Sequence, residues 1–189
     1  SWYQNWQVTV RGFCEAVLSV LGNWGRTAVV YDAGTNTDNC IAYDSSSNKV
    51  VVGYRSSSTG YGIVGTVSGT SISYGSATAL PSNVYMREAS MAYDSTNNKV
   101  VMSYRSNDDD YGYAAVGTIT GTSISWGTSV AFASAKSEHT SCVYDSSNSK
   151  IVIAFNDGAN SQYGTAIVGT VSGTTISFGT EVVFNSGES

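Results

Sequence analysis

The chain has 189 residues, of which 41% are hydrophobic and only 12% are charged, and its net charge is −5 at pH 7. Charged residues usually make up about 25% of a globular protein, so serine, threonine, glycine and asparagine supply much of the polarity here. The negative balance argues against binding to nucleic acid, which demands lysine and arginine, and no apolar run approaches the roughly 18 residues of a membrane span.

The first 38 residues predict only a partial or divergent structural unit. Residues 7–12 resemble the end of a strand that recurs later in the chain, and residues 23–25 resemble a second recurring strand. Between them, residues 13–21 form a longer segment with a weakly helical pattern. Because neither an initiator methionine nor a leader segment is present, we expect a processed product or a part of a longer chain.

From residue 39 onward the sequence repeats itself every 50 to 52 residues. The stretch Ala-Tyr-Asp-Ser-Ser-Ser-Asn-Lys returns twice with few changes, and so does Val-Gly-Thr-Val-Ser-Gly-Thr. Chance does not produce this much matching, so the repeat is the primary structural signal. It divides the chain into a partial first unit and three full units, which span residues 1–38, 39–89, 90–140 and 141–189.

Each full repeat predicts four strands. The first strand is short and built from small residues, as in 90–93, and the second is continuously apolar, as in 150–155, so both its faces should be covered. An Asp-Ser-x-x-x-Lys turn joins these two strands. The third strand, as in 165–171, leads through a tight turn at 172–173 into an alternating outer strand over 175–179.

Four antiparallel strands in about 50 residues predict the blade of a β-propeller. The predicted fold class is therefore all-β, with three full blades and a partial or divergent N-terminal blade. Three alternatives follow: the N-terminal segment completes a small ring, the chain belongs to a larger ring or array, or partner subunits close it. We favour a part of a longer ring or an assembling subunit, since exposed strand edges invite self-assembly.

The loops of the repeats differ in how much they vary. The turn between the first two strands and the turn between the last two strands are nearly the same in each repeat. The variable connections would emerge together on the opposite face of a propeller, where binding sites usually lie on a rigid frame. They are residues 56–60, 106–110 and 156–162 after the second strands, and 34–39, 82–89 and 133–140 between repeats.

Aromatic rings and planar cations border these variable loops. Sugars stack on rings and accept planar hydrogen bonds, so the pattern is typical of sugar recognition. The alternative is that the rings pack blade against blade with the arginines along their faces. The candidate ligand-binding residues are Tyr54, Arg55, Tyr61, Tyr104, Arg105, Tyr111, Asn156, Tyr163, Glu88 and His139.

Catalysis and cofactors have weaker signals. Asp38, Glu88 and Glu138 or His139 occupy corresponding positions and could converge as the acid and base of sugar hydrolysis. Residues 108–110 are three aspartates that could help to bind Ca²⁺, but they lack a full ligand set, so we expect a solvated loop and no cofactor.

The repeated aspartates and the cysteines favour structural interpretations. An aspartate opens the turn of every repeat, which favours a role as turn former. Cys14, Cys40 and Cys142 show no metal-binding spacing. They are expected to be small buried hydrophobic residues, with a Cys14–Cys40 disulfide as the alternative.

The motif Tyr-Asp-Ser-x-x-x-Lys-Val-Val followed by Val-Gly-Thr-Val-Ser-Gly-Thr resembles tandem propeller-like repeats of large secreted bacterial proteins and of phage or viral structural proteins. It is more loosely similar to kelch and lectin propellers, and it lacks the Ser-x-Asp-x-Gly-x-x-Trp box of sialidases. The resemblance implies an extracellular or virion-surface protein of bacterial or viral source. It further implies non-enzymatic recognition of a glycan or cell surface, with a fibre or filament subunit and a glycosidase-like propeller as alternatives.

Overall fold

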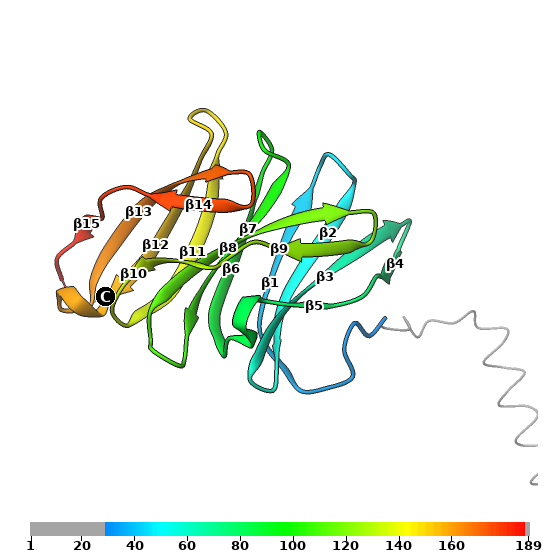
Figure 1. The fold of residues 1–189 in the computed structure, drawn as a ribbon, viewed down its shortest axis with the longest axis horizontal. Coiled ribbons are helices and arrows are strands. Elements are labelled where there is room, and N and C mark those ends of the chain that lie inside the picture. Colours follow the sequence, from blue (N-terminus) through cyan, green and yellow to red (C-terminus); the bar gives the residue numbers. More distant parts are fainter. Residues whose placement is uncertain (1–28, 188–189) are drawn as a thin grey trace, which may run out of the picture. The chain divides into compact units, whose positions relative to one another are not determined.

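Each sequence repeat forms one antiparallel sheet in the computed structural model, which describes residues 29–187 (Figure 1). The first sheet consists of β1 (Asn36–Asp44), β2 (Lys49–Ser56), β3 (Thr59–Ser68), β4 (Ser71–Tyr74) and β5 (Thr78–Ala79). The second consists of β6 (Met86–Asp94), β7 (Lys99–Ser106), β8 (Gly112–Thr120), β9 (Ser123–Trp126) and β10 (Val130–Ala133). The third consists of β11 (Ser137–Asp145), β12 (Lys150–Asp157), β13 (Tyr163–Ser172), β14 (Thr175–Phe178) and β15 (Val182–Asn185). Two short 3₁₀ helices, η1 (Pro81–Asn83) and η2 (Gly158–Asn160), lie in the connections.

The predicted all-β class with repeated antiparallel sheets is confirmed, and the sheets do not close into a barrel. Most of the predicted partial blade, residues 1–28, lies outside the described residues. Within residues 29–187, no helix is long and apolar enough to cross a membrane.

The outer strand of each repeat is split into two pieces, whereas the sequence predicts one strand. In the first sheet β4 pairs with the end of β3 and β5 pairs with its beginning. Between these pieces the Gly75 N–H donates to the Val64 carbonyl over 2.9 Å, so the ladder continues through the break. A Cβ at Gly75 would lie 1.9 Å from the carbonyl oxygen of Thr122, a residue of the second repeat. Close packing between repeats therefore requires a glycine at this break.

The Asp-Ser turn forms as predicted. Asp44 Oδ1 accepts hydrogen bonds from the backbone N–H groups of Ser46 and Ser47, and Asp94 and Asp145 repeat this arrangement in their own turns. Burial opposes ionisation of Asp44, but hydrogen bonds from Ser47 and Ser46 outweigh it and lower its pKa to about 2. The aspartates therefore build the turns from within each repeat, which explains their recurrence.

The three sheets stand face to face in chain order, and apolar side chains fill the space between each pair (Figure 1). The first core joins Val51 and Val64 of the first sheet to Met102 of the second. The second core joins Val101 of the second sheet to Ile153 of the third. The middle strand β7 is buried along nearly its whole length, as its continuous apolar pattern predicts. The innermost strands β1, β6 and β11 lie next to one another.

Cys40 and Cys142 are free thiols that pack beside these cores. Burial raises the pKa of each thiol to about 12, so each is protonated at neutral pH. Both cysteines are small side chains packed at the cores, as predicted, but they are partly rather than fully buried. Cys14 lies outside the described residues.

Candidate functional site

The innermost strand of every sheet carries a β-bulge at the same position. The register shifts between Thr37 and Cys40 in β1, and the equivalent shifts occur in β6 and β11. One residue of each bulge has a left-handed backbone: Asp38 with φ of 54°, Glu88 with 51° and His139 with 54°. Side chains rarely adopt this conformation inside a strand, so the surrounding structure must hold it in place. These are the three corresponding positions that the sequence analysis singled out.

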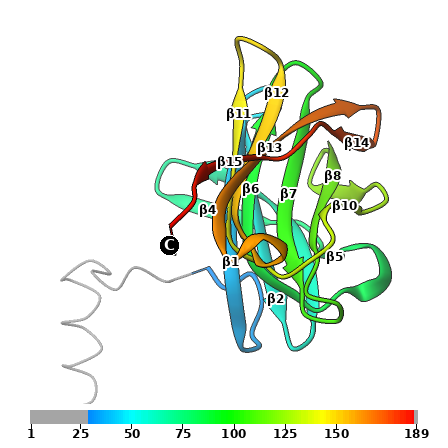
Figure 2. The same cartoon turned by 90° about the vertical axis from the view of Figure 1, so that its left-hand side faces the viewer.

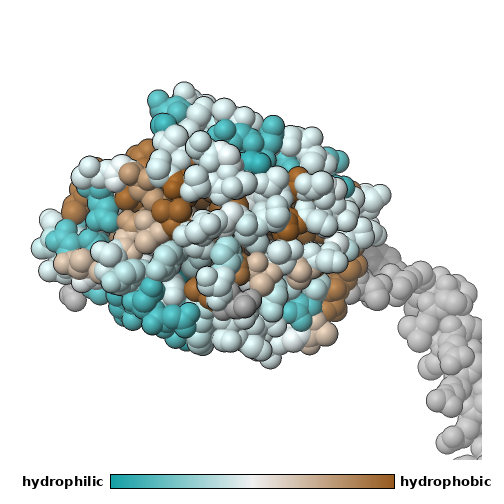
Figure 3. Space-filling view, in the orientation of Figure 1, coloured by the Kyte–Doolittle hydropathy of each residue, from teal (hydrophilic) through white to brown (hydrophobic). Residues whose placement is uncertain are grey.

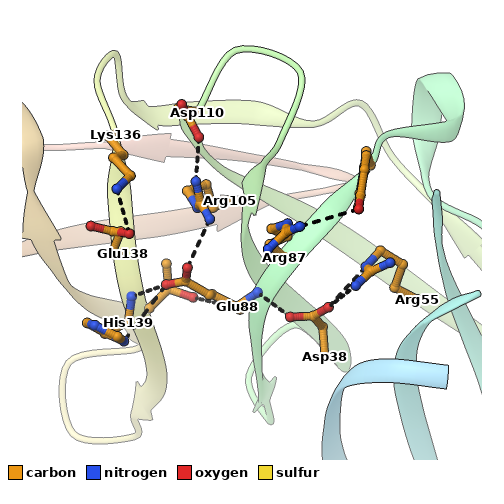
Figure 4. A network of polar contacts seen from close by, with 11 residues as sticks. Asp38, Arg55, Arg87, Glu88, Arg105, Asp110, Lys136, Glu138 and His139 are labelled. Atoms are coloured by element: carbon orange, nitrogen blue, oxygen red, sulfur yellow. Dashed lines mark hydrogen bonds and ion pairs between the residues drawn. The ribbon is translucent and has the colours of Figure 1, made fainter. Parts of the chain in front are cut away.

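Each bulge is tied to the bulge of the next sheet by a carboxylate (Figure 4). Asp38 Oδ1 accepts the Glu88 N–H over 2.9 Å. Glu88 Oε2 in turn accepts the N–H of His139, and the backbone carbonyl of Glu88 accepts the hydroxyl of Thr140. The structure thus brings the three predicted residues together across three sheets, in a chain of side-chain to backbone contacts.

Two arginines complete the network from β2 and β7, the second strands of the first two sheets. Arg55 pairs with Asp38 at 3.0 Å, and Arg105 pairs with Glu88 at 3.1 Å and also with Asp110. Partial burial opposes ionisation of Asp38, but hydrogen bonds from the Glu88 amide and from Arg55 outweigh it, so its pKa lies below the ordinary value. Asp38 is therefore held as an anion. In this form it can accept hydrogen bonds but is poorly suited to donate a proton.

Tyr85 and Arg87 belong to the same site, although the sequence analysis does not select them. The guanidinium carbons of Arg55 and Arg87 lie 4.9 and 5.4 Å from the centre of the Tyr85 ring. Arg87 also donates to the Tyr85 hydroxyl over 3.3 Å, and it forms no ion pair with any described carboxylate. Their signal in the sequence is that they differ from the corresponding residues of the other repeats, which are not Tyr and Arg.

Several predicted ligand residues lie in the core instead. Tyr54 and Tyr104 are only 2% and 1% exposed. Tyr54 stacks on Tyr61 with centroids 5.6 Å apart, and Tyr104 stacks on Tyr113 at 6.0 Å. These rings pack within and between sheets, which is the alternative to sugar recognition given for them above. The register also shows that Tyr113, which pairs with Tyr104, is the counterpart of Tyr61, and that Tyr111 precedes β8.

The remaining candidates lie at the borders of the network. Tyr111 is 36% exposed in the loop before β8. Asn156 takes the place of the arginines in the third sheet and lies opposite Glu138 in the register. Tyr163 begins β13 opposite Asp157, and the His139 side chain is 77% exposed. Lys136 pairs with Glu138 at 2.8 Å, so this end of the network is closer to solvent.

The three aspartates of the loop at 108–110 point to three different partners. Asp108 accepts the Tyr85 N–H over 3.4 Å, Asp109 accepts the Tyr113 hydroxyl over 2.7 Å, and Asp110 pairs with Arg105. No cluster of three or more metal-ligating side chains occurs in the part of the chain that the structure describes. The loop thus positions rings and an arginine around the network.

No protein-family model matches the chain, and no curated protein matches it as a relative. The visible surface is mostly weakly polar, with brown apolar patches between paler residues (Figure 3).

Proposed function

We propose that this protein is a non-enzymatic, propeller-type repeat module that recognises a glycan or another cell-surface ligand. The observation that carries the proposal is the partly buried Tyr85, whose ring contacts two arginines at the edge of a network spanning three sheets. In this proposal the protein acts outside the cell or on a virion, without a cofactor, and its source is bacterial or viral.

The chemistry of the site supports a sugar ligand. A tyrosine ring offers an apolar face for the C–H groups of a sugar, and guanidinium groups donate planar hydrogen bonds to hydroxyl or carboxylate oxygens. Arg55 is already paired with Asp38, whereas the Arg87 side chain has only the Tyr85 hydroxyl as a hydrogen-bond partner among residues 29–187. Arg87 therefore favours a glycan that carries a carboxylate, which a guanidinium binds in a bidentate manner.

The engagement of the carboxylates supports binding over sugar hydrolysis. A glycosidase needs one carboxylic acid that can give up a proton beside a second carboxylate. Asp38 and Glu88 each accept a backbone N–H from the next sheet and pair with an arginine. These contacts give both groups a structural task, and they hold the pKa of Asp38 below its ordinary value.

A glycan array with the whole chain tests the proposal. We expect binding to acidic glycans, and Tyr85→Ala or Arg87→Ala should each weaken it about tenfold or more, since a hydrogen bond to a charged group contributes about 1.5–3 kcal/mol. Lys49→Ala, in the recurring turn away from this network, is the matched control and should bind normally. Absence of binding to any glycan, or binding that neither substitution weakens, would refute the proposal. Release of free sugar from a bound glycan would favour the glycosidase alternative.

A structural subunit of a fibre or filament is the second candidate function. It is favoured by the apolar side chains that the first and third sheets expose on their outer faces, such as Ile41, Val143 and Phe184. The two functions are compatible, because an attachment fibre both assembles and binds.

A further inference from the structure

Every sheet has two different faces. We call the face that is turned toward the next sheet along the chain the trailing face, and the opposite one the leading face. Met91 and Tyr93 lie on the leading face of the second sheet and pack against the first sheet. Ala92 lies on its trailing face and packs against the third sheet. The two internal junctions of the molecule therefore follow one rule, in which a trailing face meets a leading face.

The leading face of the first sheet and the trailing face of the third sheet meet no other sheet among residues 29–187. On the first sheet, Ile41 is 63% exposed, whereas its counterpart Met91 is 7% exposed. On the third sheet, Val143 is 60% exposed, whereas its counterpart Ala92 is 7% exposed. Figure 2 looks toward the third sheet, and no further strand covers β11 and β12. The other exposed apolar side chains of these two faces include Tyr43, Val67, Val168, Val182 and Phe184.

Two polar contacts join the innermost strands at the second junction, and the corresponding groups lie at the two outer faces of the molecule. Ser90 Oγ accepts the N–H of Cys142 over 3.0 Å at the second junction. The Thr96 hydroxyl bonds to that of Tyr144 at the same junction. The counterparts of Ser90 and Thr96 are Ser141 and Ser147, which lie on the third sheet and its turn and are both exposed. On the first sheet, the counterparts of the Cys142 N–H and the Tyr144 hydroxyl are the Ile41 N–H and the Tyr43 hydroxyl. The Tyr43 hydroxyl donates to Asn48 Oδ1 over 2.9 Å and can still accept a hydrogen bond.

We propose that copies of this chain associate head to tail, with β11 of one copy beside β1 of the next. Ile41 then packs on Val143, Ser141 accepts the Ile41 N–H, and the Ser147 hydroxyl bonds to Tyr43. Tyr31 covers Tyr54 on the first sheet, with ring centroids 4.9 Å apart, so the innermost strand makes the principal contact. The partner is a second copy because these are the two kinds of face that meet at the internal junctions, with Ile41 in the position of Met91 and Val143 in the position of Ala92.

This contact joins two different surfaces, so it is heterologous. Such a contact leaves one free surface of each kind after two copies have joined, and it generates a closed ring or an open filament. It differs from pairing along exposed strand edges, because side chains of the sheet faces carry it.

Sedimentation velocity of the whole chain over a range of concentrations tests the inference. The wild-type chain should form dimers and larger species as concentration rises, whereas Ile41→Glu and Val143→Glu should each remain monomeric. An equimolar mixture of the two variants retains one intact pair of surfaces and should form dimers and nothing larger. Ser123→Glu, at an exposed position of the outer strand β9, is the control and should assemble like the wild type.

Circular dichroism checks that each variant is folded, and Val168→Glu replaces Val143→Glu if that variant is not. A wild-type chain that stays monomeric at all concentrations overturns the inference. Assembly that survives both Ile41→Glu and Val143→Glu also overturns it and indicates pairing by strand edges. A mixture of the two variants that stays monomeric shows that the surfaces are not complementary.

Discussion

The tie between Glu88 and its neighbours leads to a quantitative prediction. Replacing Glu88 with alanine removes the acceptor for the His139 N–H and one of the two carboxylates that pair with Arg105. The Arg105 side chain is only 8% exposed, so water replaces the lost contact poorly. Hydrogen bonds to charged groups contribute about 1.5–3 kcal/mol each. Because Asp110 remains beside Arg105, we expect a loss of about 3 kcal/mol in the free energy of unfolding.

Urea unfolding followed by circular dichroism measures this loss directly. In a thermal melt it corresponds to a decrease of about 6–12 °C in Tm, since about 2–4 °C accompanies each kcal/mol in a chain of this size. Glu88→Gln keeps a hydrogen-bond acceptor but loses the charge. Its free energy of unfolding should therefore lie between those of the wild type and Glu88→Ala.

The matched control is Glu138→Ala, one residue before His139. Its partner Lys136 is 45% exposed, and surface ion pairs contribute about 0–1 kcal/mol. If Glu88→Ala costs no more than Glu138→Ala, the carboxylate does not tie the sheets together and the reasoning is refuted. A Glu88→Ala variant of full stability that loses a hydrolytic activity would assign the residue to catalysis.

Three further predictions concern packing, acid and thiol chemistry. A Cβ at Gly62 would lie 2.4 Å from the ring of Trp126, so Gly62→Ala should cost about 1–3 kcal/mol in urea unfolding. Adding Trp126→Phe should recover part of this loss, and an additive or larger loss would contradict the steric explanation. The pKa of Asp44 is lowered on folding from 3.8 to about 2, so its stabilisation is present above pH 3.8 and is lost as pH falls toward 2. Asp44→Asn should therefore flatten the dependence of Tm on pH in this window. An unchanged slope would contradict the stabilising role of the ionised Asp44. Because the pKa values of Cys40 and Cys142 are raised to about 12, alkylation followed by mass spectrometry at pH 8 should label them only after unfolding. Labelling of the folded chain at either position would show that the thiol is accessible.

Local chemistry in the sequence determined the strands and turns of the described repeats. Aspartates at 44, 94 and 145 accept hydrogen bonds within their own turns, and Gly69, Gly121 and Gly173 supply φ values of 59–63° at the hairpins. These features depend on neighbours within a few residues. Because the same pattern recurs in three repeats, the all-β class of the fold could be predicted from the sequence.

Tertiary packing alone decided the composition of the candidate site. Tyr54 and Tyr104 were candidate ligand residues because they border variable loops, but both side chains are buried by packing on the faces of their sheets. Tyr85 and Arg87 lacked any repeated pattern, yet they lie at the network because the bulge at Glu88 brings their segment beside Arg55. A sequence pattern reports the period of a strand, whereas the face that becomes buried depends on which sheet packs against it.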